Sequence, residues 1–403
     1  MTRGRGWIAA ALLPALIVPA AGCGRSSGLP VVKIGFAAPL TGDQAAHGQD
    51  MLHGAQLAID QANRINNILP GHRIELVALD DQHNPTQAVS VAKKFVADSH
   101  VVAVVGHLNS SCTKPASAVY HEARMLHISP ISSNPEISRQ GFDTFRRICA
   151  TDDLQGPAAA QFAKATLGAQ RLFVLDDMTT YGRGLANEFV KALPGLGVAL
   201  VGHEGITQGE KDFTPLLTKI KSLDPDVLFF AGMFPEAALL IKQRQELGLR
   251  AQFLGSDGSY EAQLITLATP QAAEGVYLTA IGGDIRQTPT AKQFVADYEA
   301  RFGPVGAYSA YAYEATNLAL WAIKRAQRPQ QTPQEASARG ESAPAYGVPS
   351  RQAVLAAMKT LTEFPGILGT HTFNAKGDTT NRTIGIFRVH DGRFAFVTSV
   401  NPP

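Results

Sequence analysis

Short apolar runs alternate with amphipathic segments through most of the chain, which is the pattern of strands alternating with helices. Apolar residues recur at Leu52, Ala55, Ile59 and Ala62, the spacing of one helix face. The run that begins at Val101 is Val-rich, as in a strand buried on both faces. The first part of the chain therefore predicts strands at Val32–Ala38, Arg73–Leu79, Val101–Gly106, Met125–Pro130 and Thr144–Cys149, with helices at Gly48–Ile65 and from Asn84-Pro85 onward.

The same alternation restarts after residue 170. Strands are predicted at Arg171–Leu175, Val198–Gly202, Val227–Ala231, Gln252–Gly255 and Gly275–Thr279, and helices at Leu185–Ala192, Phe213–Leu223 and Ala237–Leu247. Helices at Thr290–Phe302, Tyr308–Ala326 and Ser350–Leu361 follow, and the chain ends in a hairpin of Ile384–Val389 and Arg393–Thr398 turning at Asp391-Gly392. Two successive strand–helix runs predict an α/β protein with two parallel-sheet lobes, each covered by helices. Arg328–Pro349 is rich in Pro, Gln, Ser and Ala and predicts a flexible surface insertion.

Polar side chains follow two neighbouring strands of the predicted first sheet. Asn109, Ser110, Ser111 and Thr113 come after the Val101 strand, and Pro115 with its Ala-rich run predicts a helix start. Hydroxyls and unpaired N–H groups at a strand-to-helix junction form a natural anion site, although a cluster of N-capping serines has the same appearance.

The next strand ends in a similar loop. It contains Ile131, Ser132 and Ser133, and Asn134-Pro135 is the predicted start of a helix. The two loops predict one shared binding site at the carboxyl edge of a parallel sheet.

The N-terminus predicts an export signal. Arg3 and Arg5 precede the apolar segment Trp7–Pro19, which is too short to span a membrane stably, and small residues lead to Cys23. This arrangement is that of a bacterial lipoprotein signal of 23 residues with Cys23 as the lipid-bearing residue; cleavage of a plain signal peptide is the alternative. Export permits a disulfide between the remaining Cys112 and Cys149, with two buried thiols as the other possibility.

Composition excludes several function classes. The formal net charge is +2 and basic residues do not cluster, which argues against nucleic-acid binding. The three cysteines and 11 histidines fit no metal-site spacing, and no phosphate loop or nucleophile elbow is present, so no cofactor and no metal are expected. The pair Asp80-Asp81 is expected to form a turn that starts a helix, and an acid–base pair is the disfavoured alternative.

Several strings, taken together and in order, resemble the periplasmic leucine/isoleucine/valine-binding proteins over nearly all of residues 31–400. They are Gly106-His107-Leu108 with Ser110-Ser111 and Pro115-Ala116-Ser117, Pro130 with Pro135-Glu136, Gln155-Gly156-Pro157, Tyr181-Gly182 with Gly184-Leu185-Ala186, and Gly209-Glu210-Lys211-Asp212-Phe213. The resemblance implies two doubly wound lobes joined by a three-stranded hinge, with a ligand between them. Lobe 1 would comprise 31–151 and 281–383, with 328–349 as its insertion, and lobe 2 would comprise 152–280 and 384–403.

The resemblance also implies a ligand site. Ser110 and Ser133 stand where hydroxyls bind the carboxylate and ammonium of an amino acid, and Ile131 where a backbone carbonyl accepts from the ammonium. Tyr181 corresponds to a tyrosine that closes over the ligand, and Asp257 to an acidic partner of the ammonium. An aromatic residue of the cleft wall is matched by Tyr308.

The chain departs from the family around the side-chain pocket. His47 and Met233 stand where the family has tyrosines, and Asn109 where it has a cysteine whose disulfide partner position holds His83. Polar His47 and Asn109 beside flexible Met233 put a purely aliphatic ligand in doubt. The alternative is that these three residues only border the cleft.

The expected function is that of a lipid-anchored receptor that binds an amino acid or small amide, closes around it without any covalent step, and delivers it to the permease of an ABC importer. A sensor that signals to a regulatory partner is a second hypothesis. An exported hydrolase that uses Ser110 with His107 or His127 is disfavoured, since no acid–His–Ser order or oxyanion motif is present.

Overall fold

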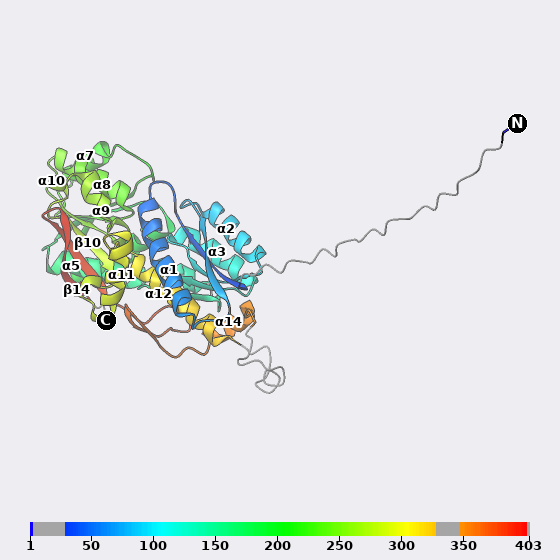
Figure 1. The fold of residues 1–403 in the computed structure, drawn as a ribbon. Helices are drawn as coiled ribbons and strands as arrows, with labels where there is room; N and C mark the ends of the chain where they lie inside the picture. Colours follow the sequence, from blue (N-terminus) through cyan, green and yellow to red (C-terminus); the bar gives the residue numbers. More distant parts are fainter. Residues whose placement is uncertain (3–28, 328–346, 401–403) are drawn as a thin grey trace.

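The computed structural model describes residues 1–2, 29–327 and 347–400 (Figure 1). Residues 3–23 of the predicted signal, Cys23 included, lie outside the described residues, as does all of the predicted insertion except 347–349. Within the described part, no helix combines the length and the apolar character that crossing a membrane requires.

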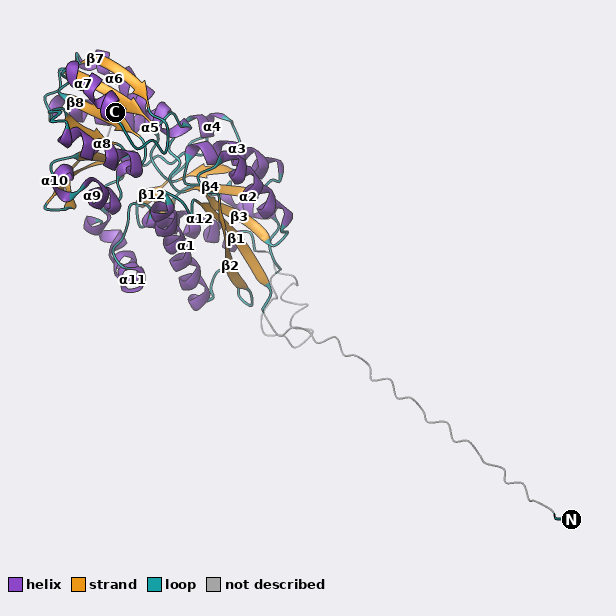
Figure 2. Cartoon of the chain, turned by 90° about the horizontal axis from the view of Figure 1, so that it is seen from above, coloured by secondary structure: helices purple, strands orange, loops and turns teal. Residues whose placement is uncertain are grey.

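The first sheet has five parallel strands in the order β2-β1-β3-β4-β5. All six residues of β3 are buried, as the Val-rich run predicts. Helices α1, α12 and α14 share an apolar cluster with one face of this sheet, and α2 and α3 pack on the other face (Figure 2). The elements are β1 Val31–Ala38, α1 Ala45–Ile65, β2 Arg73–Asp80, α2 Pro85–Ala97, β3 Val101–Gly106, α3 Ser110–Glu122, β4 Leu126–Ser129, α4 Glu136–Arg139 and β5 Phe145–Arg147.

The second sheet has seven strands in the order β14-β13-β10-β9-β8-β6-β7. Strands β7, β6, β8, β9 and β10 are parallel, and the terminal hairpin β13–β14 adds an antiparallel edge. Both residues of the hairpin turn, Asp391 and Gly392, have positive φ, as the sequence predicts. The elements are α5 Asp152–Ala165, β6 Arg171–Asp176, α6 Thr180–Leu196, β7 Ala199–Gly205, α7 Thr214–Ser222, β8 Val227–Ala231, α8 Phe234–Glu246, β9 Gln252–Gly255, α9 Ala262–Ala268, α10 Pro270–Ala273 and β10 Tyr277–Ile281.

The remaining elements return to the first lobe before the hairpin completes the second. Helix α12 packs against α1, and Asp378 forms a bridge with Arg147 at the end of β5. The chain therefore passes between the lobes after β5, after β10 and before β13. These elements are α11 Lys292–Phe302, α12 Ser309–Arg325, α14 Arg351–Met358, β11 Phe364–Gly366, β12 Gly369–His371, β13 Ile384–His390 and β14 Arg393–Val400.

The predicted helix start at Pro115 is wrong. Helix α3 begins at Ser110, and Pro115 lies inside it. Asn109 is the extended N-cap residue, and its carbonyl oxygen accepts from the N–H groups of Cys112 and Thr113 at 3.0 and 2.9 Å. The helix therefore starts on a polar segment of low helix propensity, which the surrounding tertiary structure overrides.

Of the two possibilities for Cys112 and Cys149, the structure has the two free, buried thiols and not the disulfide. Cys112 lies on α3, which packs with α2 on one face of the first sheet. Cys149 belongs to the apolar cluster that contains α1 and α12 on the other face. The two side chains are therefore kept apart by the sheet between them.

We expect both thiols to be unreactive in the native protein, because burial raises the pKa of Cys112 and of Cys149. After denaturation without a reductant, a form of the chain that begins at residue 29 should label at both cysteines with a maleimide. If neither cysteine were labelled in the denatured, unreduced protein, the two would be joined in a disulfide.

Candidate functional site

The first lobe contributes side chains from the carboxyl ends of β3 and β4. Asn109 and Ser110 sit at the start of α3, and Ile131 and Ser133 lie in the loop after β4. The hydroxyl oxygen of Ser110 accepts from the backbone N–H of Asn134 at 3.3 Å, which ties the two loops together. Because the first N–H groups of a helix have no partner within it, this end of α3 favours a negatively charged group.

The second lobe contributes Tyr181, Met233 and Asp257, which follow β6, β8 and β9. Tyr181 lies in the first turn of α6, Met233 is the N-cap residue of α8, and Asp257 begins a single 3-10 turn. The carboxyl ends of parallel strands thus supply the site from both lobes, in agreement with the general rule for open α/β sheets.

Eight of the nine predicted ligand-binding residues border one small cavity between the lobes, with a volume of about 20 Å³. We call it the interlobe cavity. The ninth, His47, lies behind it: its ring packs against Tyr308 with centroids 4.7 Å apart, and its Nε2 lies 3.3 Å from the carbonyl oxygen of Gly258. The lining consists of Leu108, Asn109, Ser110, Ile131, Ser133, Tyr181, Met233, Asp257, Gly258 and Tyr308.

The lobes touch each other at this cavity. The hydroxyl of Tyr308, at the start of α12, donates to the backbone oxygen of Asp257 at 2.8 Å. The side-chain amide of Asn134 donates to the carbonyl oxygen of Thr180 at 2.6 Å. A Cβ atom on Gly184 would lie 2.1 Å from that amide, so a side chain at this position is incompatible with the contact.

Asp257 is buried and receives three neutral donors. Its Oδ1 accepts from the hydroxyl of Tyr181 at 2.5 Å and from the amide of Gln155 at 2.9 Å. Its Oδ2, at 3.2 Å, shares the single hydroxyl proton of Tyr308 with the backbone oxygen of Asp257. Burial raises the pKa of Asp257, and the hydrogen bonds oppose this shift. A cation beside this carboxylate would offset the free-energy cost of burying its charge.

Polar groups beside the cavity lack partners among the described residues. These atoms are Oδ1 of Asn109, the hydroxyl oxygen of Ser133 and both carboxylate oxygens of Asp152. Burial raises the pKa of Asp152 well above its usual range, and the nearby Asp257 adds to the shift. Since buried polar groups usually have partners, this concentration marks a site built to receive polar atoms.

Sequence reasoning missed Asp152, Gln155 and Gln44. The first two lie on α5, a helix that the periodicity did not predict, although Thr151 followed by two aspartates resembles a helix start. Gln44 accepts from the side-chain amide of Asn109 at 2.8 Å and contacts Nδ1 of His83 at 2.6 Å. The position of Asn109 is therefore fixed by a contact that reaches back to His83.

The predicted turn at Asp80-Asp81 is confirmed: their carboxylates accept from the N–H groups of Gln82 and His83. Asp81 also forms a buried hydrogen bond with Nδ1 of His107 at 2.7 Å, which the sequence did not suggest. Nε2 of His107 contacts the hydroxyl of Tyr120 at 3.1 Å.

His127 likewise has a partner elsewhere, since its Nε2 contacts the carbonyl oxygen of Gly106 at 2.7 Å. Neither His127 nor His107 forms a hydrogen bond with Ser110, so the geometry of a Ser–His pair is absent from the described residues.

Asp177 is buried directly after β6, and this burial raises its pKa to about 7 against the hydrogen bonds from Thr179. The native state therefore holds a proton that the unfolded state has released, so this group lowers stability as the pH rises from about 4 to 7. Asp177→Asn should remove this cost, on the order of 4 kcal/mol, at pH 8 and have little effect at pH 4.

The free energy of unfolding of the variant and of the original chain, measured by urea titration at both pH values, checks this prediction. Comparing the two proteins at each pH cancels the opposite contribution of His127, whose pKa burial lowers to about 3. An equal difference at pH 4 and pH 8 would contradict it.

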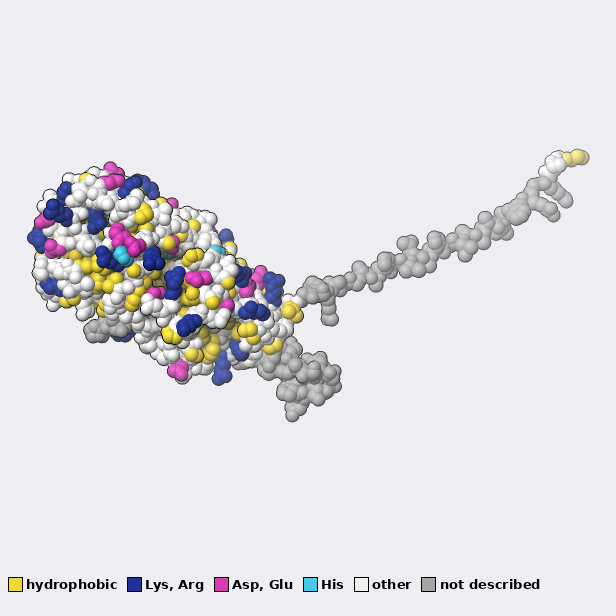
Figure 3. Space-filling view, turned by 60° about the vertical axis from the view of Figure 1, so that its left-hand side comes forward, with side chains coloured by type: hydrophobic (Ala, Val, Ile, Leu, Met, Phe, Trp, Pro, Cys, Tyr) yellow, Lys and Arg dark blue, Asp and Glu magenta, His cyan; other side chains and the backbone are white. Residues whose placement is uncertain are grey.

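The surface carries no dominant charge on the face shown in Figure 3, where cationic and anionic side chains are interspersed. This agrees with the formal net charge of +2. Recognition by the interlobe cavity therefore depends on local groups more than on a long-range field.

Comparison with known proteins gives one consistent result. The family model for periplasmic binding proteins matches residues 31–393. An amino acid binding protein of Pseudomonas aeruginosa is 42% identical over 284 residues, covering 70% of this chain and 75% of that protein. A Leu/Ile/Val-binding protein homolog of Brucella suis is 37% identical over 348 residues, covering 86% of this chain and 87% of the relative.

Solved structures have the same architecture. The leucine-binding protein LivK of Thermotoga maritima matches with a TM-score of 0.80 at 28% identity, covering 92% of this chain and 99% of that one. LivJ of Streptococcus pneumoniae, solved with isoleucine, matches with a TM-score of 0.80 at 25% identity, covering 92% and 100%. The predicted fold class is confirmed, and the chain belongs to the periplasmic binding protein family, with the leucine/isoleucine/valine-binding proteins among its relatives.

Proposed function

We propose that this chain is the substrate-binding protein of an ABC importer and that it binds a branched-chain or related amino acid in the interlobe cavity. As a family member it is a binding protein and not an enzyme. The observation that carries the proposal is a pair of opposite electrostatic features across the cavity: the start of α3 with Ser110 on one side, and buried Asp257 on the other. An amino-acid zwitterion matches this pair, with its carboxylate at the helix and its ammonium at Asp257.

The residue roles in this proposal follow the chemistry of the lining. Ser110, Ser133 and the carbonyl of Ile131 hold the main-chain groups of the ligand, and Tyr181 and Tyr308 cover it. Asn109, Met233 and the neighbouring His47 surround its side chain and favour a ligand that is not purely aliphatic. A thermal-shift screen of the exported chain against the amino acids and their amides tests this, and no stabilisation by any of them would refute it.

Membership of the family implies export to the periplasm. Within the proposal, Cys23 carries a lipid that anchors the protein at the membrane, and the partners are the permease subunits of the importer. The lobe boundaries near residues 151, 281 and 383 belong to the same proposal. The names of the relatives describe binding and transport proteins, so a separate sensor role gains no support from them.

We expect the lobes to separate and close as the ligand enters. A cavity of about 20 Å³ accommodates about one water molecule and not an amino acid, so binding requires the contacts of Tyr308 and Asn134 with the other lobe to open first. A ligand that touches both lobes then stabilises the closed form. Small-angle scattering should show a smaller radius of gyration at saturation with a confirmed ligand, and an unchanged radius would contradict closure.

A further inference from the structure

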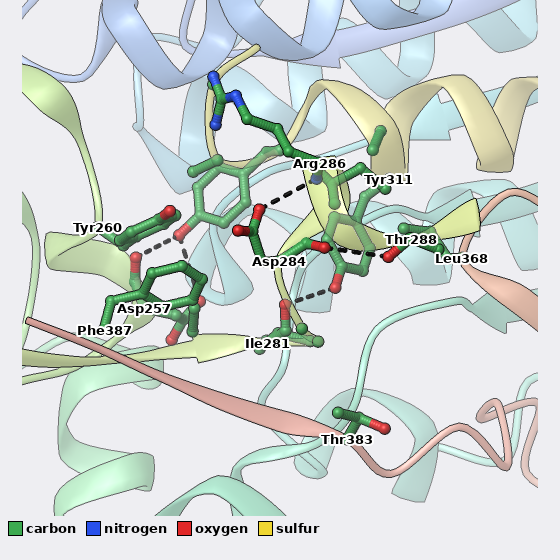
Figure 4. Close-up of a pocket in the computed structure, with 18 of the residues that line it drawn as sticks. Asp257, Tyr260, Ile281, Asp284, Arg286, Thr288, Tyr311, Leu368, Thr383 and Phe387 are labelled. Atoms are coloured by element: carbon green, nitrogen blue, oxygen red, sulfur yellow. Dashed lines mark hydrogen bonds between the residues drawn. The ribbon is translucent and has the colours of Figure 1, made fainter. Parts of the chain in front are cut away.

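A second and larger cavity lies beside the strands that connect the lobes. Its volume is about 260 Å³, and it borders the end of β10, the segment before β13 and the start of α12 (Figure 4). Asp257 and Tyr308 line this cavity as well as the interlobe cavity, so their hydrogen bond at 2.8 Å forms a partition between the two. We call the larger one the connector cavity.

Four aromatic residues line it, namely Tyr260, Tyr308, Tyr311 and Phe387. Tyr260 and Phe387 pack together with ring centroids 4.6 Å apart, and Figure 4 shows them on the same side as Asp257. Tyr311 lies opposite, with its hydroxyl donating to the carbonyl oxygen of Ile281 at 2.5 Å. Aromatic faces attract organic cations and also cover their carbon chains.

Three charged residues line the cavity, the carboxylates Asp257 and Asp284 and the guanidinium of Arg286. The carboxylate of Asp284 accepts from the N–H of Arg286 at 3.0 Å and from the side-chain amide of Gln287 at 2.9 Å, and each oxygen retains a further acceptor position. The guanidinium of Arg286 pairs with Glu299 at 3.6 Å and donates to the carbonyl of Val305 at 3.1 Å. Figure 4 shows this guanidinium directed away from Asp284, so the positive charge is already balanced elsewhere.

We propose that the connector cavity binds a small organic cation of the alkylammonium class. The carboxylate of Asp284 is its ion partner, and the rings of Tyr260 and Phe387 pack against its carbon chain. Tyr260 and Thr383 also line the cavity, and a hydroxyl oxygen can accept from an N–H group of a primary ammonium. This site is separate from the amino-acid site of the proposed function, since Asp284, Tyr260 and Phe387 do not line the interlobe cavity.

Calorimetric titration of the exported chain with propylammonium chloride tests the proposal, with sodium propionate as the ligand of opposite charge. We expect saturable binding of propylammonium in the millimolar range and none of propionate. Asp284→Asn should weaken the binding by at least about tenfold, because it removes the ion partner. Tyr260→Leu should weaken it, whereas Tyr260→Phe retains the ring and should largely preserve it.

Asp212→Asn is the matched control. The carboxylate of Asp212 also accepts from the N–H two residues further on, at 2.9 Å, but Asp212 lies outside the cavity lining. Binding of propylammonium should be unchanged in this variant. Absence of binding to the original chain, equal binding in Asp284→Asn, or preference for propionate would each overturn the proposal.

L-Valine is titrated in parallel to separate this proposal from the proposed function. It should bind Asp284→Asn as it binds the original chain. If L-valine and the other amino acids fail to bind while propylammonium binds through Asp284, only the proposed function is refuted. If L-valine binds and propylammonium does not, only the connector site is refuted.

Discussion

Replacing Asp257 by asparagine is expected to weaken amino-acid binding by well over tenfold while leaving the thermal stability of the ligand-free protein almost unchanged. The affinity falls because a ligand ammonium in this cavity, stripped of water, loses its anionic partner, and such truncations typically cost about 2–5 kcal/mol. Stability persists because the asparagine side chain has the same shape as aspartate, and its amide oxygen can still accept from Tyr181 and Gln155. Burial raises the pKa of Asp257 because it disfavours the charged form, and the loss of this penalty in asparagine offsets the weaker hydrogen bonds that a neutral amide accepts.

Calorimetry with the amino acid that gives the largest thermal shift measures this effect. Asp226→Asn is the matched control, since this exposed carboxylate of the same lobe accepts from two backbone N–H groups, of Gln170 and Arg171, far from the cavity. Original affinity in Asp257→Asn would remove Asp257 from the site, and with it the argument that the ligand carries an amine.

Replacing Arg147 by methionine is expected to destabilise the protein by about 3–5 kcal/mol. Arg147 is fully buried and donates to Asp378 at 2.5 Å, to the carbonyl oxygens of Ser132 and Asn134 at 2.8 and 2.7 Å, and to the hydroxyl of Ser138 at 3.0 Å. Methionine fills most of the volume but removes the cationic partner of Asp378 and a hydrogen-bond donor from two carbonyls.

The effect should extend to the binding site, because the two carbonyls belong to the loop after β4 that carries Ser133. Urea denaturation gives the loss of stability, and ligand titration should show weaker binding at temperatures where the variant remains folded. Arg139→Met is the control, since this exposed arginine pairs with Glu136 at the surface and should change stability by less than about 1 kcal/mol. If Arg147→Met were as stable as the control, the network would contribute nothing measurable.

Periodicity predicted most of the architecture from the sequence. Strand β3 was recognisable as a Val-rich apolar run, and all six of its residues are buried. The terminal hairpin was recognisable because Asp391-Gly392 suits a turn with two positive φ angles. Helix α5 was missed although it is rich in alanine, the residue of highest helix propensity. Its buried face also carries the polar residues Asp152 and Gln155, which interrupt the apolar periodicity. The start of α3 was misplaced because Ser, Cys and Thr have low helix propensity, and only tertiary contacts show that the helix begins there.

The site was predictable in part for a different reason. Resemblance to a family assigned positions whose side chains the fold brings together, and eight of them border the interlobe cavity. Contacts between distant segments could not be predicted in the same way. Arg147 with Asp378, Asp257 with Gln155, and His107 with Asp81 are far apart in sequence and have no periodic signal. The connector cavity likewise forms from segments that are widely separated along the chain.

Because the chain passes three times between the lobes, neither lobe can finish folding early in synthesis. Synthesis proceeds from the N-terminus, yet the first lobe needs α12 and Asp378, and the second sheet needs β13 and β14 at residues 384–400. Neither lobe can therefore complete its core until nearly the whole chain has left the ribosome. Pairings between such distant segments also form slowly. An exported protein gains from this delay, because a chain without a finished core can still be threaded through a narrow translocation channel.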